Sequence, residues 1–325
     1  MKVVSELIDY RSDIKVVDAT LRDGGLVNDF YFTDEFVRDL YIANQKAGVD
    51  YMEFGYKASK ELFDVNKFGK WKFCNDDDIR AVVGDNNTDL KVAVMADVGR
   101  CDYKNDILDR KESPIDLIRV ATYINTIPAA VDMIEDAAKK GYETSCNIMA
   151  ISNSRDENEL RAALDILGKT PVDAIYIVDS FGSLYPEQIA RIGEMYLEFA
   201  NKYNKKVGIH AHNNQQLAFA NTIELCSMGV DWLDATYDSM GRGAGNCAME
   251  LLLGFLRNPK YQVYPVIKFI QDHMNKLKED GIVWGYDLQY LMTGLLNQHP
   301  RTAIQFTKEN RKDYAEFYKE IVAQD

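Results

Sequence analysis

Short apolar runs alternate along this chain with longer segments in which apolar residues recur at helical spacing. The first run, 15–21, leads into Arg22-Asp23-Gly24-Gly25, and the spacing predicts that a helix then begins at Thr33 and ends at Gly48. Most runs are apolar throughout, which is typical of parallel strands covered on both faces. Seven further runs predict strands, at 51–56, 91–96, 117–122, within 143–151, and at 174–178, 206–209 and 230–235.

The pattern repeats a strand, a turn and a helix, and it predicts eight strands in total. Eight parallel strands that alternate with helices are what a closed (β/α)8 barrel, the TIM barrel, requires. An open doubly wound sheet is the competing architecture, but no Gly-x-Gly-x-x-Gly motif follows the first strand. We therefore predict an α/β protein, a TIM barrel with a C-terminal helical extension.

Three domain segments follow from this reading: an N-terminal lead over 1–14, a catalytic barrel over 15–257 and a helical extension over 258–325. Within the barrel, 58–90 is a long connection that contains Trp71 and an acidic run, and we expect an elaborated loop with a short helix. In the extension, one amphipathic helix is predicted over 266–277 and a second over 286–297. The extension could cap the barrel mouth or form a subunit interface.

The net charge limits the class of binding partner, and the cysteine usage indicates the cellular compartment. The formal net charge of -13 argues against nucleic acid or an anionic membrane as the main partner and favours a small ligand. The five cysteines are scattered and form no Cys-x-x-Cys pair, which indicates a reducing compartment rather than a disulfide framework. The first residues lack the apolar core of a signal peptide, and no apolar stretch is long enough to span a bilayer. We expect a cytoplasmic protein.

The strongest chemical signal is His210-Ala211-His212, which follows the seventh predicted strand. Residues two apart on a strand point to the same face, so both imidazoles should project together from the strand's C-terminal end, as metal ligands do. The alternative is one core histidine beside an exposed one, but two of only four histidines fall at this spacing. Asp23, at the end of the first strand, offers the anionic ligand, although an Asp before glycines is often an ordinary turn residue.

Two histidines and a carboxylate also describe the facial triad of iron oxygenases, which usually stand on an all-β scaffold. Because strands alternate with helices in this chain, the iron oxygenase is a minor alternative. Residues 241–246 follow the eighth strand and lack the Gly-Lys-Ser/Thr of a phosphate loop. They either form a flexible loop or bring the backbone close to the site, which would let the side-chain carbonyl oxygen of Asn246 reach the metal.

Three motifs resemble the signature of the metal-dependent aldolase and lyase barrels, which include 4-hydroxy-2-oxovalerate aldolase, hydroxymethylglutaryl-CoA lyase and isopropylmalate synthase. The similarity covers about 15–255. Arg119-Val120-Ala121-Thr122 and Val178-Asp179-Ser180 favour the oxovalerate aldolase branch. The motifs are Thr20-Leu21-Arg22-Asp23-Gly24, His210-Ala211-His212-Asn213-Asn214 and the Gly-Ala-Gly-Asn segment that ends at Asn246.

This resemblance implies a lyase whose divalent ion is held by Asp23, His210 and His212, with Asn246 as a further ligand. Mn²⁺ is the expected ion, ahead of Mg²⁺, Co²⁺ and Zn²⁺. The ion would polarise a 2-oxo acid such as pyruvate, and Arg22 would stabilise the enolate that forms on carbon-carbon cleavage. Glu53, Ser180 and Thr122 are expected to bind substrate.

The chain also departs from the family pattern. Leu26 stands where the oxovalerate aldolases have a histidine base, and the catalytic cysteine of the lyase is absent, since Cys247 follows the glycine-rich loop. The catalytic proton carrier is predicted to be His299, with Tyr56, Tyr123 and Tyr286 as alternatives.

The predicted function is a metal-dependent aldolase. The alternatives are a Claisen-type acyl-CoA transferase of the isopropylmalate synthase kind and a non-catalytic metal-binding barrel. We further expect a homo-oligomer and consider an aldehyde dehydrogenase as a partner.

Overall fold

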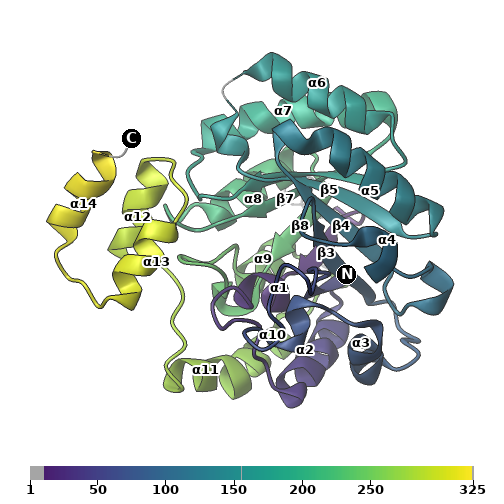
Figure 1. The fold of residues 1–325 in the computed structure, drawn as a ribbon, viewed down its shortest axis with the longest axis horizontal. Helices are drawn as coiled ribbons and strands as arrows, with labels where there is room; N and C mark the ends of the chain where they lie inside the picture. The colour runs from purple at the N-terminus through teal and green to yellow at the C-terminus, as the bar shows by residue number, and fades with distance from the viewer. Residues whose placement is uncertain (1–10, 155, 324–325) are drawn as a thin grey trace, which may run out of the picture.

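The computed structural model describes residues 11–154 and 156–323, and in it eight parallel strands close into a barrel in sequence order (Figure 1). The last strand pairs with the first, so the TIM barrel is confirmed and the open sheet is wrong. Most of the predicted lead, 1–14, lies outside the described residues. The strands are β1 (Lys15–Asp18), β2 (Tyr51–Tyr56), β3 (Lys91–Asp97), β4 (Leu117–Thr122), β5 (Glu143–Ile148), β6 (Ala174–Asp179), β7 (Lys206–Ala211) and β8 (Trp232–Ala235).

Helices surround the barrel, and their ends follow the signals in the sequence. At the start of α2 the Thr33 hydroxyl accepts a hydrogen bond from the backbone N–H of Phe36, and the helix ends at Gly48, whose φ is 76°. The helices of the barrel are α1 (Thr20–Gly24), α2 (Asp34–Ala47), α3 (Asp76–Val83), α4 (Tyr103–Asp106), α5 (Ile127–Lys139), α6 (Glu157–Gly168), α7 (Pro186–Tyr203), α8 (Ala218–Met228) and α9 (Met249–Leu256).

The first strand is shorter than the apolar run predicts. It ends at Asp18, and Thr20–Gly24 form the single helical turn α1 instead of extending the strand. The reason is local hydrogen bonding: the buried Asp18 carboxylate accepts from both the backbone N–H and the hydroxyl of Thr20, which folds the chain back. Arg22 and Asp23 therefore project from a buried helical turn and not from a strand end or a glycine turn.

Side chains inside the barrel form layers, because every second residue of a strand points inward. The lowest layer is apolar and aromatic, with Tyr51 stacked on Trp232 at 4.8 Å between ring centroids. Two residues further along their strands come Glu53 and Asp234, and both are fully buried. Charge thus occupies the layer directly above the apolar floor and below the barrel mouth.

A bulge in β2 sets the direction of the next side chain in that strand. The pairing of β2 with β3 shifts between Glu53 and Tyr56, so one extra residue is accommodated there. Gly55 lies in the bulge with a φ of 152°, and a Cβ atom at this position would stand 1.9 Å from the carbonyl oxygen of Trp71. Trp71 belongs to the predicted long connection over 58–90, which contains the expected short helix, α3. The bulge and the connection together place Tyr56 at the mouth.

The C-terminal extension has two parts (Figure 1). The amphipathic helix predicted over 266–277 is observed as α10 (Val263–Phe269), a π-helical turn over Ile270–Met274 and α11 (Asn275–Glu279). This part packs on α2, where Phe269 contacts the ring of Phe36 at 5.0 Å between centroids.

The second part is a cluster of three helices at the rim of the barrel mouth. The helix predicted over 286–297 is observed as α12 (Leu288–Leu295). It is joined by α13 (Arg301–Lys308) and α14 (Tyr314–Val322), which lie within the predicted helical extension but for which no separate bounds were predicted. Its own apolar core includes Phe306 and Phe317. The amide of Asn214, after β7, donates to the carbonyl of Tyr290 at 3.1 Å, so the cluster is anchored to the loops of the mouth. No helix among the described residues is long and apolar enough to cross a membrane.

Replacing Gly55 by Ala should destabilise the fold, because the new methyl group meets a backbone carbonyl and the residue keeps a positive φ. We expect the free energy of unfolding to fall by about 2 kcal/mol or more in urea titrations. The control is Gly254→Ala in α9, where a Cβ meets nothing within 4 Å. That change should raise the free energy of unfolding by about 0.5 to 1 kcal/mol. Wild-type stability for Gly55→Ala would show that the bulge is not constrained.

Candidate metal centre

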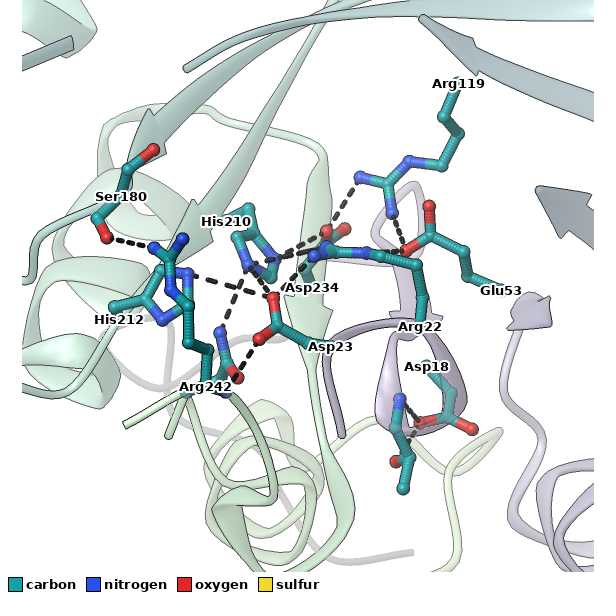
Figure 2. Close-up of polar contacts among 12 residues, drawn as sticks. Asp18, Arg22, Asp23, Glu53, Arg119, Ser180, His210, His212, Asp234 and Arg242 are labelled. Carbon is teal, nitrogen blue, oxygen red and sulfur yellow. Dashed lines mark hydrogen bonds and ion pairs between the residues drawn. The ribbon is translucent and has the colours of Figure 1, made fainter. Parts of the chain in front are cut away.

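Asp23, His210 and His212 converge at the mouth of the barrel (Figure 2). One ligand atom from each lies within 4.8 Å of the other two, and all three residues are buried. The Nε2 atoms of His210 and His212 lie 3.1 and 3.7 Å from Oδ2 of Asp23. The structure therefore brings together the three side chains that the sequence selected, two from the end of β7 and one from α1.

Asn246 adds a fourth polar group to this cluster. Its Nδ2 lies 3.1 Å from Nε2 of His210, and its buried Oδ1 has no hydrogen-bond partner among the described residues. Gly241 leaves the space for this oxygen, since a Cβ there would lie 1.7 Å from Oδ1 of Asn246. Two imidazoles, a carboxylate and an unsatisfied amide oxygen form a donor set that fits a divalent ion.

A carboxylate behind His210 determines which ring nitrogen faces the cluster. Nδ1 of His210 lies 3.0 Å from Oδ2 of Asp234, and its Nε2 lies 3.1 Å from Oδ2 of Asp23. A proton on Nδ1, donated to Asp234, would leave the lone pair of Nε2 for an ion on the side of Asp23. Asp234 also accepts from Arg119 at 2.7 Å, and Arg119 donates to Glu53 at 2.9 Å. The same oxygen of Glu53 accepts from Nε of Arg22 at 2.9 Å.

The electrostatic environment favours the charge states that a metal site needs in Asp23 and His212, whereas in His210 it favours the protonated ring, whose proton an ion would have to displace. Burial raises the pKa of Asp23, but the attraction of Arg22, His212 and His210 outweighs it and holds this pKa well below its usual value. Burial also lowers the pKa of His212 well below its usual value, so its ring is neutral. Burial lowers the pKa of His210 as well, although Asp23 and Asp234 raise it by more. Asp23 is thus anionic and His212 is free to coordinate.

The other predicted site residues fall into two groups. Arg22 and Ser180 line a cavity of about 60 Å³ above the cluster. The structure does not bring Glu53 or Thr122 to the wall of this cavity: Glu53 is fully buried behind Arg22, and the Thr122 hydroxyl bonds to the carbonyl of Tyr123. Both residues support side chains or loops near the mouth.

The candidate proton carriers are also separated by the structure. Tyr56 lines the cavity, whereas Tyr123 and Tyr286 are exposed. His299 reaches the edge of the site from the C-terminal extension, but its Nε2 faces Nη1 of Arg242 at 3.3 Å and it does not line the cavity. Burial, then Arg242 and Arg301, lower the pKa of His299 to about 4. Leu26 lines the cavity, so the place of the usual histidine base is apolar.

A known protein family matches most of this chain. The family model described as HMGL-like matches residues 13–273, which is most of the chain. The chain belongs to the HMGL-like family.

Relatives in this family confirm the resemblance that the sequence motifs indicate. The chain is 30% identical over 261 residues to the 4-hydroxy-2-oxovalerate aldolase of Thermus thermophilus, which covers 78% of this chain and 72% of that protein. It is 29% identical over 245 residues to the oxaloacetate decarboxylase of Mycobacterium tuberculosis, covering 74% of this chain and 69% of the relative.

Solved structures show the same fold. The N-terminal domain of a candidate aldolase from Bacteroides vulgatus superposes with a TM-score of 0.76 at 27% identity, covering 90% of this chain and 96% of that one. The HMG-CoA lyase of Bacillus subtilis superposes with a TM-score of 0.66 at 15% identity, covering 83% and 95% of the two chains. The barrel is thus the fold of these proteins.

Two residues of this family member's site were missed from the sequence, Asp234 and Arg242. Asp234 could have been found, because a single acid inside the apolar strand β8 must face a partner in the barrel interior. Arg242 stands between glycines in the loop after β8, where the sequence indicates a flexible loop or a ligand oxygen from Asn246 and gives no role to the arginine. No pattern in the sequence distinguishes Arg242 from an exposed loop residue.

The metal site can be tested by thermal unfolding with and without Mn²⁺. An ion that binds only the folded state stabilises it by about 2.7 kcal/mol at one hundred times its dissociation constant, so we expect the wild-type melting temperature to rise by several degrees. His212→Ala removes a ligand and should abolish most of this rise. The control is His273→Gln, since His273 pairs with Asp39 away from the mouth, and its shift should match the wild type. Equal shifts in all three proteins would exclude this site.

Proposed function

We propose that this chain is a divalent-metal-dependent aldolase, a lyase that breaks or forms a carbon-carbon bond through the enolate of pyruvate or a related 2-oxo acid. The observation that carries the proposal is the buried cluster of Asp23, His210 and His212 with Arg22 beside it. The relatives' names support it, because 4-hydroxy-2-oxovalerate and oxaloacetate are both 2-oxo acids. Breaking the carbon-carbon bond once removed from the keto group leaves the enolate of pyruvate in both cases.

Asp23, His210 and His212 would hold the ion, with the oxygen of Asn246 available as a fourth ligand. When bound, a divalent ion supplies Lewis acidity toward the carboxylate and keto oxygens of a 2-oxo acid. A set that mixes imidazole with oxygen ligands suits Mn²⁺, and Mg²⁺, Co²⁺ and Zn²⁺ are the alternatives. The residues keep their orientation because Asp234 holds His210 and Arg22 holds Asp23.

Arg22 is placed to stabilise negative charge that develops on the substrate. Burial lowers its pKa, but Glu53 and Asp23 raise it well above the usual value, so the guanidinium stays protonated. Its Nε is tied to Glu53 and its Nη2 lies 3.4 Å from the His210 ring at the edge of the cavity. A donor fixed before the reaction stabilises an enolate oxygen without having to reorganise.

The cavity supports a small substrate. Its volume is about 60 Å³, and Leu26, Met95 and Val178 contribute apolar walls that exclude water. A 2-oxo acid of a few carbon atoms matches this size better than an acyl-CoA, which favours the aldolase over the Claisen-type transferase. The scaffold alternative does not account for a charged donor fixed beside the ligands and exposed to the cavity.

Tyr56 is the tyrosine among the proposed proton carriers that lines the cavity. Burial raises the pKa of its phenol, so the protonated form faces the substrate. In the cleavage direction Tyr56 would donate a proton to the enolate carbon, which completes pyruvate. His299 remains the alternative carrier, acting from the edge of the site. A cytoplasmic location, a homo-oligomer and an aldehyde dehydrogenase partner also stay predictions.

Proton exchange tests the function without knowledge of the second substrate. In heavy water with Mn²⁺, the protein should exchange the methyl protons of pyruvate, which is followed as loss of the methyl signal in NMR. His212→Ala should slow the exchange by more than about 100-fold, because ion-assisted enolisation is worth several kcal/mol. His273→Gln and a protein-free sample with Mn²⁺ serve as controls. Absence of exchange would support the scaffold, and consumption of an acyl-CoA with 2-oxo acid would support the Claisen-type transferase.

The two proton carriers can be separated in the same assay. Tyr56→Phe removes only the hydroxyl and should slow the exchange by about 100-fold or more, as loss of a general acid or base does. His299→Ala should slow it by less than about tenfold, since this ring faces Arg242 and not the cavity. The reverse order of effects would assign proton transfer to His299.

A further inference from the structure

Arg242 is a cation at the cavity wall whose guanidinium forms no ion pair among the described residues, although its backbone N–H donates to Oδ1 of Asp23 at 2.9 Å. Its side chain comes from the loop after β8 and lines the cavity beside His212. Nη2 donates to the carbonyl oxygen of Ser180 at 2.8 Å, and Nη1 lies 3.3 Å from Nε2 of His299. The Nε–H is buried and has no hydrogen-bond partner among the described residues, and no carboxylate among them forms an ion pair with Arg242.

The other two arginines in the barrel interior are different. Arg22 pairs with Asp23 and Glu53, and Arg119 pairs with Glu53 and Asp234, so carboxylates neutralise both guanidinium groups. Arg242 is held by a neutral carbonyl and by a ring whose low pKa keeps it neutral. These partners orient the guanidinium without cancelling its charge. Removing a cation from water costs free energy when no counter-charge accompanies it. An anion that binds beside Arg242 therefore gains more interaction free energy than it would beside a solvated arginine.

The two cavity arginines lie on opposite sides of the metal cluster (Figure 2). Arg22 stands on the side of Glu53 and Arg119, whereas Arg242 stands on the side of Ser180 and His299. A ligand whose 2-oxo acid head is centred on Asp23, His210 and His212 with its enolate oxygen toward Arg22 would extend its other end toward Arg242. The 2-oxo acid head would then contact the donors on the side of Arg22. Arg242 would remain available for a second polar group of the same ligand.

We propose that the substrate of this site carries a second anionic group, and that Arg242 pairs with it: the enzyme acts on a 2-oxo dicarboxylate. The inference rests on the proposed function, because the cluster is taken to hold a 2-oxo acid head. His299 is then a positioning residue, since its Nε2 contacts Nη1 of Arg242 and fixes the direction of the guanidinium group. The C-terminal extension thereby contributes to substrate recognition.

Matched pairs of ligands test the proposal by calorimetry on the full chain with Mn²⁺. Oxaloacetate is compared with 2-oxobutyrate, and 2-oxoglutarate with 2-oxovalerate, so the members of each pair differ by a terminal carboxylate in place of a methyl group. At least one dicarboxylate should bind the wild type about 10- to 100-fold more tightly than its partner, because a charged hydrogen bond is worth about 1.5 to 3 kcal/mol. Arg242→Gln should remove this preference and change the affinity for the monocarboxylates less than about threefold.

Two controls make the result specific. Arg301→Gln removes a nearby exposed positive charge and should keep the preference, while Arg242→Lys should retain part of it. The Mn²⁺-induced rise in melting temperature must be the same in Arg242→Gln as in the wild type, which shows that the cluster is intact. His299→Ala should reduce the preference without abolishing it.

Several outcomes overturn the proposal. Equal weakening of both members of a pair by Arg242→Gln would mean that Arg242 holds the common 2-oxo acid head, and no weakening would mean that it binds no ligand. Failure of the proposed function would give a result that differs from failure of the role of Arg242. Pyruvate would then show no methyl exchange, even if a preference that depends on Arg242 persisted. Exchange without a dicarboxylate preference would leave the aldolase standing and refute the role of Arg242.

Discussion

The ion-pair network around Glu53 is the interaction on which the rest of this molecule depends. One oxygen of its carboxylate accepts from both Arg22 and Arg119, and Arg119 continues the network to Asp234 and from there to His210. The carboxylates and Arg119 are essentially inaccessible to solvent, and Arg22 is nearly so. In such surroundings each charge needs its partner, because removing one leaves another buried and unpaired. The network therefore orients His210 and Arg22, the proposed metal ligand and the proposed substrate donor, as a single unit.

The alternation of side chains along the strands explains why this network lies where it does. Tyr51 and Glu53 point inward from one strand, and Trp232 and Asp234 do the same from another. The aromatic floor excludes water from below, and the loops of the mouth close the site from above. A polar layer between these two boundaries is costly in stability unless every group is satisfied. In the proposed function its use is preorganisation, because the donors and ligands would already be oriented when the substrate binds.

Segments outside the repeating barrel unit complete the site. The bulge at Gly55, pressed against the connection that carries Trp71, directs Tyr56 into the cavity. The last three helices form a small core of their own and deliver His299 to Arg242 from beyond the barrel. Leu26, which occupies the place of the usual histidine base, lines the same cavity. The proposed roles in proton transfer and substrate specificity thus fall to Tyr56, the last residue of β2, and to Arg242, in the loop after β8.

The sequence by itself determined the barrel and the three residues at the core of the candidate metal site. Eight apolar runs separated by helical segments leave few alternatives to a closed parallel sheet, and strand geometry alone aligns His210 with His212. Only the tertiary structure decided that Asp234 contacts His210, that Glu53 lies behind Arg22 and that the Arg242 guanidinium meets a carbonyl oxygen and His299 but no carboxylate of the described chain. The physical reason is that periodicity is local, whereas these contacts join residues far apart in the chain. Whether a charge is paired depends on which strands and loops close around it, and no spacing along one strand encodes that.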